Sequence, residues 1–299
     1  MSTKRVLVLG GTGMLGHKLV QVLPDHGYEV WASLRGKPVE LSRFGLLSEE
    51  RIVGGVEATD VDSIRQAFVK SDPDVVVNAV GVVKQKREAG NATISIEINS
   101  LLPNRLYDLC REFDSALLSI STDCVFKGDR GRYDEEDATD AEDLYGRSKA
   151  LGEIRGKNAV TIRTSIIGRE LRSTQGLLEW FISQNGQTVF GFKNAFFSGL
   201  STEALANAIA RYVLPSRQLE GIYHVSADRI SKFELLKKIR AALDLDIKIV
   251  AKGDPRIDRS LDSTRFSEMT GFEAPSWDDM IRGIAEDPTP YEEWRKLST

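Results

Sequence analysis

The sequence of 299 residues has few of the side chains that build disulfide scaffolds or metal centres. It contains two cysteines, Cys110 and Cys124, and three histidines. Two thiols cannot make the disulfide framework of a small secreted domain, and no histidine lies near a cysteine or another histidine in the sequence. We therefore expect two reduced thiols and no metal site, and we interpret His17 as a residue on a helix surface.

Basic charge and long apolar runs are also scarce. The formal net charge is -4 at pH 7, which argues against a general binder of nucleic acid or of a membrane surface. No apolar run approaches the roughly 20 residues of a membrane span, and the first residues show no signal-peptide pattern. We expect a cytoplasmic protein, and its 41% hydrophobic and 28% charged residues are typical of a globular chain.

The first 167 residues alternate between short apolar runs and helical patterns. Runs typical of buried strands lie at 5–9, 28–32, 74–79, 116–121 and 159–166. Helical spacing of apolar residues is found at 14–23, 61–69, 94–113 and 144–155, and Pro103 should bend or break the third of these helices. The alternation predicts an α/β fold of the Rossmann type, a doubly wound parallel sheet with helices on both faces.

After Gly168 this alternation loosens. We expect helices at 177–184, 202–214 and 232–243, strands at 221–226 and 247–250, and then an acidic tail with two tryptophans. We interpret residues 1–167 as a dinucleotide-binding domain and residues 168–299 as mainly a smaller α/β substrate-binding lobe. The strand near 221–226 is expected to return to the first domain.

A glycine-rich loop follows the first expected strand. The run GGTGMLG places Gly10, Gly13 and Gly16 at the spacing G-x-x-G-x-x-G, between a strand and a helix. Glycine permits a tight turn and lets the backbone approach a pyrophosphate, while the helix N-terminus supplies free N–H donors. The loop therefore predicts a dinucleotide site that includes these glycines together with Met14 and Leu15.

The end of the second expected strand bears on the choice of cofactor. An acid at this position selects NAD by binding the ribose, but no acid lies between Glu29 and Glu40. Ser33 can donate a hydrogen bond to a phosphate, and Arg35 and Lys37 can pair with it. This favours NADP(H), and it stays compatible with NAD(H) because the Arg35 guanidinium can also stack on adenine.

Tyr145 and Lys149 lie one helical turn apart on the helix expected at 144–155. A phenol has a pKa near 10, and a nearby cation lowers it. Lys149 can act as that cation and can also hold the nicotinamide ribose. Tyr145 would then donate a proton to a carbonyl oxygen while hydride reaches the carbonyl carbon.

Polar side chains close two of the expected strands at the same edge of the sheet. Strand 116–121 runs into Ser121-Thr122-Asp123, and an earlier strand ends with the residues Asn78, Ala79, Val80 and Gly81. Ligands of doubly wound sheets bind outside the carboxyl ends of the strands. The Tyr145–Lys149 pair, common by itself in helices, therefore has the neighbours that an active site needs.

These residues resemble the extended short-chain dehydrogenase/reductases, and within them the dTDP-4-dehydrorhamnose reductase branch. The resemblance rests on GGTGMLG, STDCVFKG at 121–128, GRYDE at 131–135, YGRSK at 145–149, GE at 152–153, RTS at 163–165 and GIYHVS at 221–226. It covers the first 170 residues well and the remainder loosely. It implies an NAD(P)H-dependent reductase of a 4-keto-6-deoxy nucleotide sugar, in surface-polysaccharide or deoxysugar biosynthesis.

The resemblance also implies roles at single positions. Thr122 is similar to the hydroxyl that binds the substrate carbonyl, Tyr145 to the general acid and Lys149 to its partner. Asn99 is similar to an asparagine that supports the lysine through a water. Glu57 and Ala58 stand where the family brackets adenine, and Ile166 stands near the nicotinamide.

A nucleotide-sugar substrate requires cations for its diphosphate and apolar walls for its base and sugar. The cations we expect near the cleft are Lys84, Arg169, Arg172 and Lys193. The residues expected nearer the sugar are Val83, Ser121, Asp123 and Phe126.

Several positions depart from the pattern of this branch. Cys124 stands where an aromatic residue is common, GFKNAFF at 191–197 replaces the D-Q-x-x-x-P-T stretch, and no magnesium-binding carboxylates are recognisable. A different base or an N-acetylated sugar is therefore compatible with the sequence. Two alternatives stay open: a non-catalytic regulatory subunit that binds nucleotide sugar or NADP, and an epimerase or dehydratase that retains NAD. The chain is expected to be a monomer or a homodimer.

Overall fold

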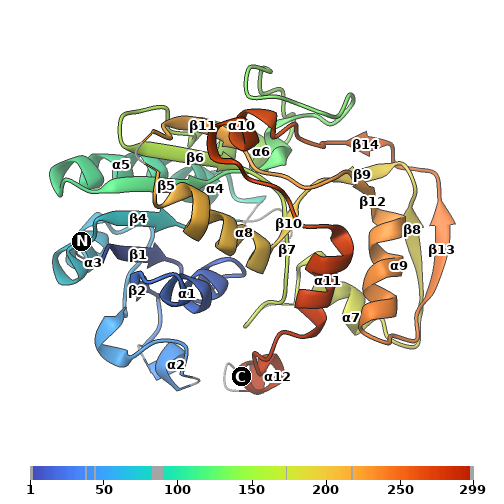
Figure 1. The fold of residues 1–299 in the computed structure, drawn as a ribbon, viewed down its shortest axis with the longest axis horizontal. Coiled ribbons are helices and arrows are strands. Elements are labelled where there is room, and N and C mark those ends of the chain that lie inside the picture. The colour runs from blue at the N-terminus through green and yellow to red at the C-terminus, as the bar shows by residue number, and fades with distance from the viewer. Residues whose placement is uncertain are drawn as a thin grey trace.

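A seven-stranded sheet forms the centre of the structure (Figure 1). The computed structural model describes residues 3–37, 39–43, 45–82, 90–172, 174–216 and 218–296. The strands of the sheet are β1 (Arg5–Leu9), β2 (Glu29–Ser33), β3 (Ile52–Val53), β4 (Val75–Asn78), β5 (Ala116–Ile120), β6 (Ala159–Arg163) and β11 (Gly221–His224). Their order is β11-β6-β5-β4-β1-β2-β3, and all neighbours run parallel. The order confirms the doubly wound fold that the alternating pattern predicts.

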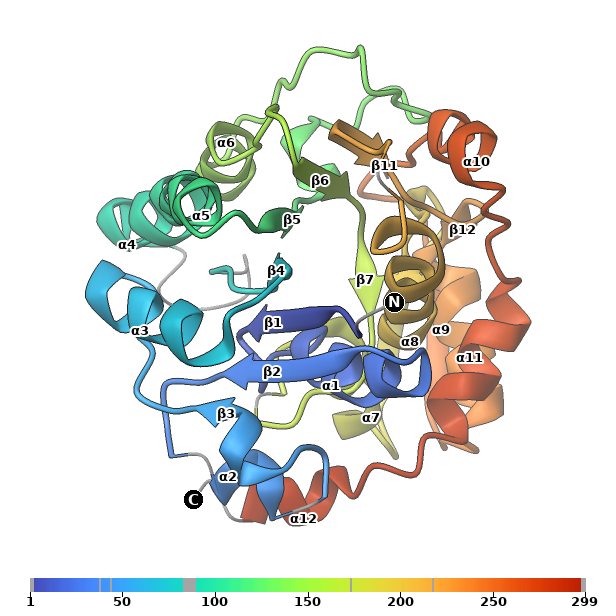
Figure 2. The same ribbon diagram turned by 60° about the vertical axis from the view of Figure 1, so that its left-hand side comes forward.

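Helices cover both faces of this sheet (Figure 2). In the described part they are α1 (Gly16–Asp25), α2 (Val39–Ser42), α3 (Val61–Ser71), α4 (Ala92–Ile96), α5 (Leu102–Glu112), α6 (Leu144–Leu151), α7 (Leu177–Ser183), α8 (Thr202–Ala208), α9 (Lys232–Ala242), α10 (Thr264–Thr270), α11 (Trp277–Ala285) and α12 (Tyr291–Lys296). Val6 and Val8 of β1 belong to a core with residues of α1 and α8. Leu7 and Leu9 belong to a second core with residues of α3 and α5. A strand that is apolar at every position must be covered on both faces, because its side chains alternate.

Three smaller sheets belong to the second half of the chain. Their strands are β7 (Ile166–Ile167) with β10 (Leu200–Ser201), β8 (Thr188–Phe192) with β13 (Lys248–Lys252), and β9 (Ala195–Phe197) between β12 (Ile230–Ser231) and β14 (Ile257–Asp258). They are packed by α9 and α11 beside the carboxyl edge of the large sheet (Figure 1). This agrees with the second, smaller set of α/β elements that we expect after Gly168.

The long helix expected at 94–113 is divided in three. A π-helical turn at Glu97–Leu101 separates α4 from α5, and Pro103 lies in the first turn of α5. Proline is tolerated there because the first N–H groups of a helix have no intrahelical partner. π-Turns are frequent at functional sites, and this one carries Asn99.

The strand expected at 159–166 is shorter in the structure. β6 ends at Arg163, and Ile166 begins β7, which pairs with β10 instead of continuing in the large sheet. The sequence pattern gave no indication of β8 or of the two-residue β3, because runs this short or this exposed lack a clear apolar period. No helix within the described ranges has both the length and the apolar character of a membrane-crossing segment.

Candidate active site

The glycine loop between β1 and α1 is closed by its own backbone. Gly10 has a φ of +83°, which glycine tolerates, and the Gly13 N–H donates to the Gly10 carbonyl at 2.9 Å. A Cβ on Gly16 would lie 2.0 Å from that carbonyl oxygen, so a glycine is required for α1 to begin this close to β1. Met14 and Leu15 therefore stand at the open N-terminal end of α1, where the geometry fits a pyrophosphate.

β2 ends beside this loop, because the Gly11 N–H donates to the Ser33 carbonyl at 2.9 Å. The Ser33 side chain is buried, whereas Arg35 is exposed just beyond the strand. Burial lowers the pKa of Arg172, and the charge of Arg35 lowers it further. The fold thus brings a second guanidinium, from the segment after β7, towards Arg35, and two guanidinium groups suit a phosphate.

The segment after β4 closes the other side of the loop. A Cβ on Gly10 would lie 3.1 Å from Val80 Cγ2. The Ala79 N–H donates to the Leu9 carbonyl at 3.2 Å, and the Val80 N–H donates to Asn78 Oδ1 at 3.2 Å. The residues from Asn78 to Gly81 therefore continue the edge on which the glycine loop lies.

Asn99 joins this segment to α6. Its side-chain oxygen accepts from the Val82 N–H at 3.0 Å, and its amide nitrogen donates to the Val82 carbonyl at 3.2 Å. The same amide nitrogen donates to Ser148 Oγ at 3.1 Å. Asn99 is buried and holds the residue next to Lys149, so it can support the lysine through the backbone of α6.

Three other expected cofactor residues lie at the same edge. Glu57 is exposed, and Ala58 packs partly against the core beneath α3. Ile166 is half-buried at the start of β7. Their expected contacts with adenine and nicotinamide stay predictions.

Tyr145 is brought to Thr122 by a close approach of α6 to the turn at Asp123–Val125. A Cβ on Gly146 would lie 2.2 Å from the Cys124 carbonyl oxygen, so glycine permits this contact. The Asp143 side chain caps α6 by accepting from the Gly146 N–H at 2.8 Å. Thr122 Oγ1 accepts from the Cys124 N–H at 3.1 Å and donates to Asp123 at 3.1 Å.

The surroundings of Tyr145 and Lys149 shift the pKa of both groups. Burial raises the pKa of Tyr145 above its usual value, with a contribution from Cys124, while the Thr122 hydroxyl within hydrogen-bonding reach opposes the rise. Lys149 Nζ donates to the Ile120 carbonyl at 2.6 Å. Burial lowers the pKa of Lys149 to about 8, partly opposed by Glu153. The phenol thus keeps its proton at neutral pH, as a general acid must.

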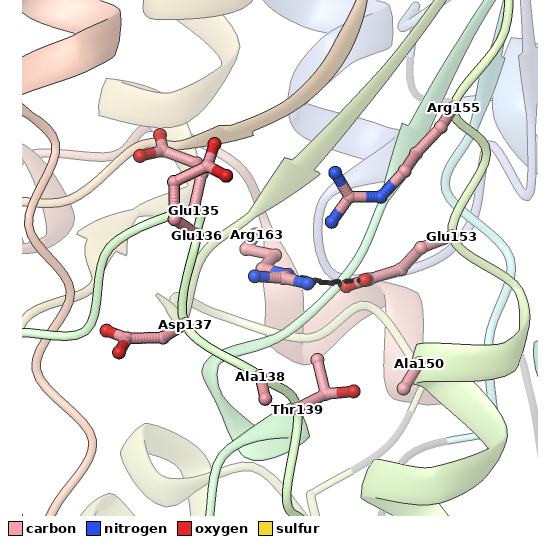
Figure 3. A pocket seen from close by; sticks show the side chains of 9 residues that line it. All are labelled: Glu135, Glu136, Asp137, Ala138, Thr139, Ala150, Glu153, Arg155 and Arg163. Atoms are coloured by element: carbon pink, nitrogen blue, oxygen red, sulfur yellow. Dashed lines mark hydrogen bonds and ion pairs between the residues drawn. The ribbon is translucent and has the colours of Figure 1, made fainter.

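A buried ion pair lies behind α6 and corrects one expectation (Figure 3). Arg163 donates to the two oxygens of Glu153 at 2.8 and 2.7 Å, and Ser121 Oγ donates to Glu153 Oε1 at 2.7 Å. Ser121 Oγ is therefore engaged in this network, whereas we expected it to face the substrate. Consecutive residues of an extended segment point to opposite sides, so only Thr122 can face Tyr145.

Phe126 also lies elsewhere than we expected. It is 0% exposed, it stacks on Tyr133 with ring centroids 4.3 Å apart, and the Arg163 guanidinium lies over its ring. Phe126 is therefore a core residue beneath the active-site turn, whereas we expected it near the sugar. Asp123 does lie beside Thr122, and burial raises its pKa, opposed by the charge of Arg259.

The side chains that we expected to bind phosphate lie in different surroundings. Arg169 pairs with Glu179 at 2.7 Å and lies over the ring of Tyr291, so it fastens α7 and α12 and is not available for a diphosphate as expected. Lys193 is exposed at the turn between β8 and β9, with its ammonium over the Phe233 ring. Val83 and Lys84 lie outside the described residues.

Two features of the site are absent from our expectations. Arg259, after β14, donates to the Phe126 carbonyl at 2.7 Å, and its charge opposes the rise that burial causes in the pKa of Asp123 and of Cys124. His17 is 0% exposed, so its interpretation as a surface residue is wrong. Residues 286–296 cover it. No local pattern could have revealed either feature, since the contacts involve residues far apart in the chain.

The two thiols of the chain have low reactivity. Cys110 and Cys124 are free, and burial raises the pKa of each thiol to about 12, which makes both poor nucleophiles. No cluster of three or more metal-ligating side chains is found among the described residues.

The chain matches a known family over nearly its whole length. The family model described as RmlD substrate binding domain matches residues 4–287. A dTDP-4-dehydrorhamnose reductase of Streptomyces griseus is 31% identical over 50% of this chain and 43% of its own length. The spore coat polysaccharide biosynthesis protein SpsK of Bacillus subtilis is 27% identical over 93% of this chain and 95% of its own. Methionine adenosyltransferase 2 subunit beta of Danio rerio is 26% identical over 81% and 75%.

Solved structures show the same fold. A hypothetical dTDP-4-dehydrorhamnose reductase from Sulfolobus tokodaii is 29% identical, with a TM-score of 0.75 over 92% of this chain and 98% of its own. A dTDP-4-dehydrorhamnose reductase from Bacillus anthracis in complex with NADP is 20% identical, with a TM-score of 0.79 over 96% and 100%. The chain therefore belongs to the RmlD substrate-binding domain family, and it is a dTDP-4-dehydrorhamnose reductase-like member of the extended short-chain dehydrogenase/reductases.

Proposed function

We propose that this chain is an NADPH-dependent reductase that converts the ketone of a nucleotide-bound 4-keto-6-deoxy sugar into an alcohol. The observation that carries the proposal is that Tyr145 lies within hydrogen-bonding reach of Thr122 at the carboxyl edge of the sheet, with the buried Lys149 one turn further along α6. The family consists of NAD(P)-dependent reductases of nucleotide sugars, and the names of the relatives from Streptomyces griseus and Bacillus subtilis support this substrate class.

The cofactor is proposed to lie along the edge formed by the glycine loop. Gly10, Gly13, Met14, Leu15 and Gly16 would hold its pyrophosphate, because the tight loop leaves the N-terminal end of α1 open. The remaining positions would hold its two nucleoside ends: Ser33, Arg35, Glu57, Ala58, Asn78, Ala79, Val80, Gly81, Asn99, Tyr145, Lys149 and Ile166. The exposed Arg35 favours NADP(H), and NAD(H) stays a second candidate.

The chain's own side chains would supply the proton. Thr122 Oγ1 would hold the substrate carbonyl by a hydrogen bond, and Tyr145 would give its proton to the carbonyl oxygen. The nicotinamide supplies the hydride that completes the reduction at carbon. Lys149 would stabilise the phenolate that remains. Its ammonium is hydrogen-bonded to the Ile120 carbonyl, and among the described residues no carboxylate lies within ion-pair distance of it. Its positive charge would therefore be available to the phenolate.

NADPH oxidation with freshly generated UDP-, dTDP- and GDP-4-keto-6-deoxy sugars tests the proposal, with NADH in parallel. We expect turnover of at least one sugar. In Tyr145→Phe the rate should fall by about 10² to 10⁴-fold, the usual contribution of a general acid, with NADPH binding and melting temperature retained. Tyr212→Phe is the matched control and should keep the rate, because Tyr212 lies in the π-helical turn Ile209–Val213 after α8 and packs on Phe272. Equal turnover in the two variants would refute the role of Tyr145.

A non-catalytic regulatory subunit is the second candidate. The relative from Danio rerio is named as a subunit of another enzyme. Retention of both Tyr145 and Lys149 argues against it, because a binding subunit has no use for a proton donor. Absence of NADPH oxidation with every keto sugar, together with a stoichiometric co-purifying partner, would favour this candidate. NAD that stays bound through purification would instead indicate the epimerase or dehydratase.

A further inference from the structure

A buried polar network links the glycine loop to the C-terminal segment, which we define as residues 286–296. Lys18 of α1 pairs with Asp287 at 2.6 Å, and their side chains are only 8% and 5% exposed. Tyr291 Oη donates to Asp287 Oδ2 at 2.5 Å and lies 3.0 Å from His17 Nε2. The segment is therefore anchored on α1 by charged and polar groups, in addition to the apolar packing of Tyr291 and Trp294 in the core.

His17 continues this network into the loop. Its Nδ1 lies 2.8 Å from the Gly13 carbonyl oxygen, which can only accept, so Nδ1 must carry the hydrogen. Burial lowers the pKa of His17 to about 4, so the ring is neutral at pH 7 and Nε2 is an acceptor. Nε2 and Asp287 Oδ2 are both acceptors, so the single hydrogen of the Tyr291 hydroxyl is shared between them, at heavy-atom distances of 3.0 and 2.5 Å. This three-centre hydrogen bond and the edge-on packing of the two rings, with centroids 5.7 Å apart, fix the orientation of the imidazole.

The Gly13 carbonyl is thereby held by two donors. The His17 backbone N–H donates to it at 3.1 Å as a helical bond, and the imidazole adds the second bond. The peptide unit is planar and trans, so the Met14 N–H points opposite to the Gly13 carbonyl. Fixing the carbonyl along α1 points the Met14 N–H out of the helix N-terminus, where a pyrophosphate would bind.

A purely structural role would not need this arrangement. Burying polar and charged groups costs free energy, and apolar residues of similar volume commonly stabilise a protein at least as well. The hydrogen-bonded ring does what an apolar side chain cannot, because it restrains one peptide of the loop.

We propose that His17 and Tyr291 are positioning residues for the dinucleotide, and that the C-terminal segment acts on the cofactor site through the Tyr291 side chain alone. They act through the Gly13–Met14 peptide and touch neither the substrate nor the reacting atoms. This inference rests on the proposed function, because it assumes that the loop binds NADPH.

The test compares NADPH dissociation constants, measured by fluorescence, in Tyr291→Phe and Gln21→Met. Gln21 donates to Thr289 at 2.9 Å, so its replacement loosens the same segment without changing a contact of His17. Tyr291→Phe should raise the Kd about 5-fold, the value of one hydrogen bond, while kcat at saturating NADPH stays within about twofold. Gln21→Met should lower the melting temperature and leave the Kd unchanged.

A double-mutant cycle separates positioning from packing. If His17 and Tyr291 act through one carbonyl, His17→Leu should raise the Kd as Tyr291→Phe does, and the double variant should add no further loss. A Kd for Tyr291→Phe equal to that of the wild-type protein would overturn the inference alone. A wild-type protein that binds neither NADPH nor NADH would overturn the proposed function and the inference together.

Discussion

The helices α1 and α6 each carry a buried lysine within their first two turns, and the two lysines have opposite surroundings. Lys18 forms an ion pair with Asp287 at 2.6 Å. Lys149 donates to the Ile120 carbonyl at 2.6 Å, while the nearby Glu153 pairs with Arg163. Burial lowers the pKa of Lys149 to about 8, because an uncharged carbonyl compensates a buried ammonium incompletely.

This difference is the one expected between a structural cation and a reactive one. A carboxylate that is buried with its lysine fixes the charge and makes it unavailable to a ligand. A buried lysine without that partner carries an incompletely compensated charge, which a phenolate or a ribose hydroxyl can stabilise. The spacing from Tyr145 distinguishes Lys149 in the sequence, but which acid lies near each lysine depends on the fold.

Replacing each lysine by methionine gives the largest expected contrast. Lys149→Met should reduce keto-sugar reduction by about 10²-fold, within the range of acid–base catalysis, and should change the unfolding free energy by less than about 1 kcal/mol. Lys18→Met should lose about 3–5 kcal/mol of unfolding free energy, because Asp287 is left buried without its cation. Urea unfolding and NADPH oxidation measure the two effects. Similar stability losses in both variants would contradict the distinction.

The pH dependence of the rate should report the charge of Lys149. We expect kcat/KM for keto-sugar reduction to be level below pH 7 and to fall above pH 8, by about 30-fold at pH 9.5, as the ammonium loses its proton. Lys149→Arg stays charged, so its slower reaction should keep a level profile to higher pH. A wild-type rate that is level to pH 10 would show that this charge does not matter.

The stability of the protein should depend on pH in acid, because two histidines are buried, one of them in α1. Burial lowers the pKa of His17 to about 4, and burial with the charge of Arg163 does the same for His224. The unfolded chain then binds more protons than the folded one between pH 6.5 and 4, so stability falls as the pH falls through this window. Each histidine should contribute about 2 kcal/mol of loss from pH 7 to pH 5.

The variant His17→Leu isolates one of these contributions. Its loss of unfolding free energy between pH 7 and pH 5 should be smaller than that of the wild-type protein by the share of one histidine. Equal losses in the variant and in the wild-type protein, measured by urea unfolding, would show that folding does not lower the pKa of His17.

The smallest expected effect concerns the choice of cofactor. Arg35→Ala should weaken NADPH binding by about tenfold, as for the loss of one charge-assisted contact to a phosphate, and should leave NADH binding within about twofold. Arg111→Ala, an exposed arginine on α5, is the control. Equal weakening for the two cofactors would mean that Arg35 stacks on adenine and does not read the phosphate.

Local patterns were sufficient for six of the seven strands of the large sheet and for the identity of the family. Apolar runs at 5–9, 74–79 and 116–121 became β1, β4 and β5, because a strand covered on both faces is apolar throughout. The glycine loop and the Tyr145–Lys149 pair could be found because their chemistry requires fixed spacing along the chain. The limits of the second-half elements and the direction of each site residue were less accessible.

The sequence by itself determined the fold class, the glycine loop and the pairing of a phenol with a lysine, since each follows from periodicity or from spacing within a few residues. Only the tertiary structure decided that Thr122 faces Tyr145 while Ser121 joins Glu153, and that Phe126 belongs to the core. It also decided that His17 is covered by Tyr291, 274 residues away. The physical reason is that burial and hydrogen-bond partners depend on which distant segments pack together, and short-range patterns contain no record of that packing.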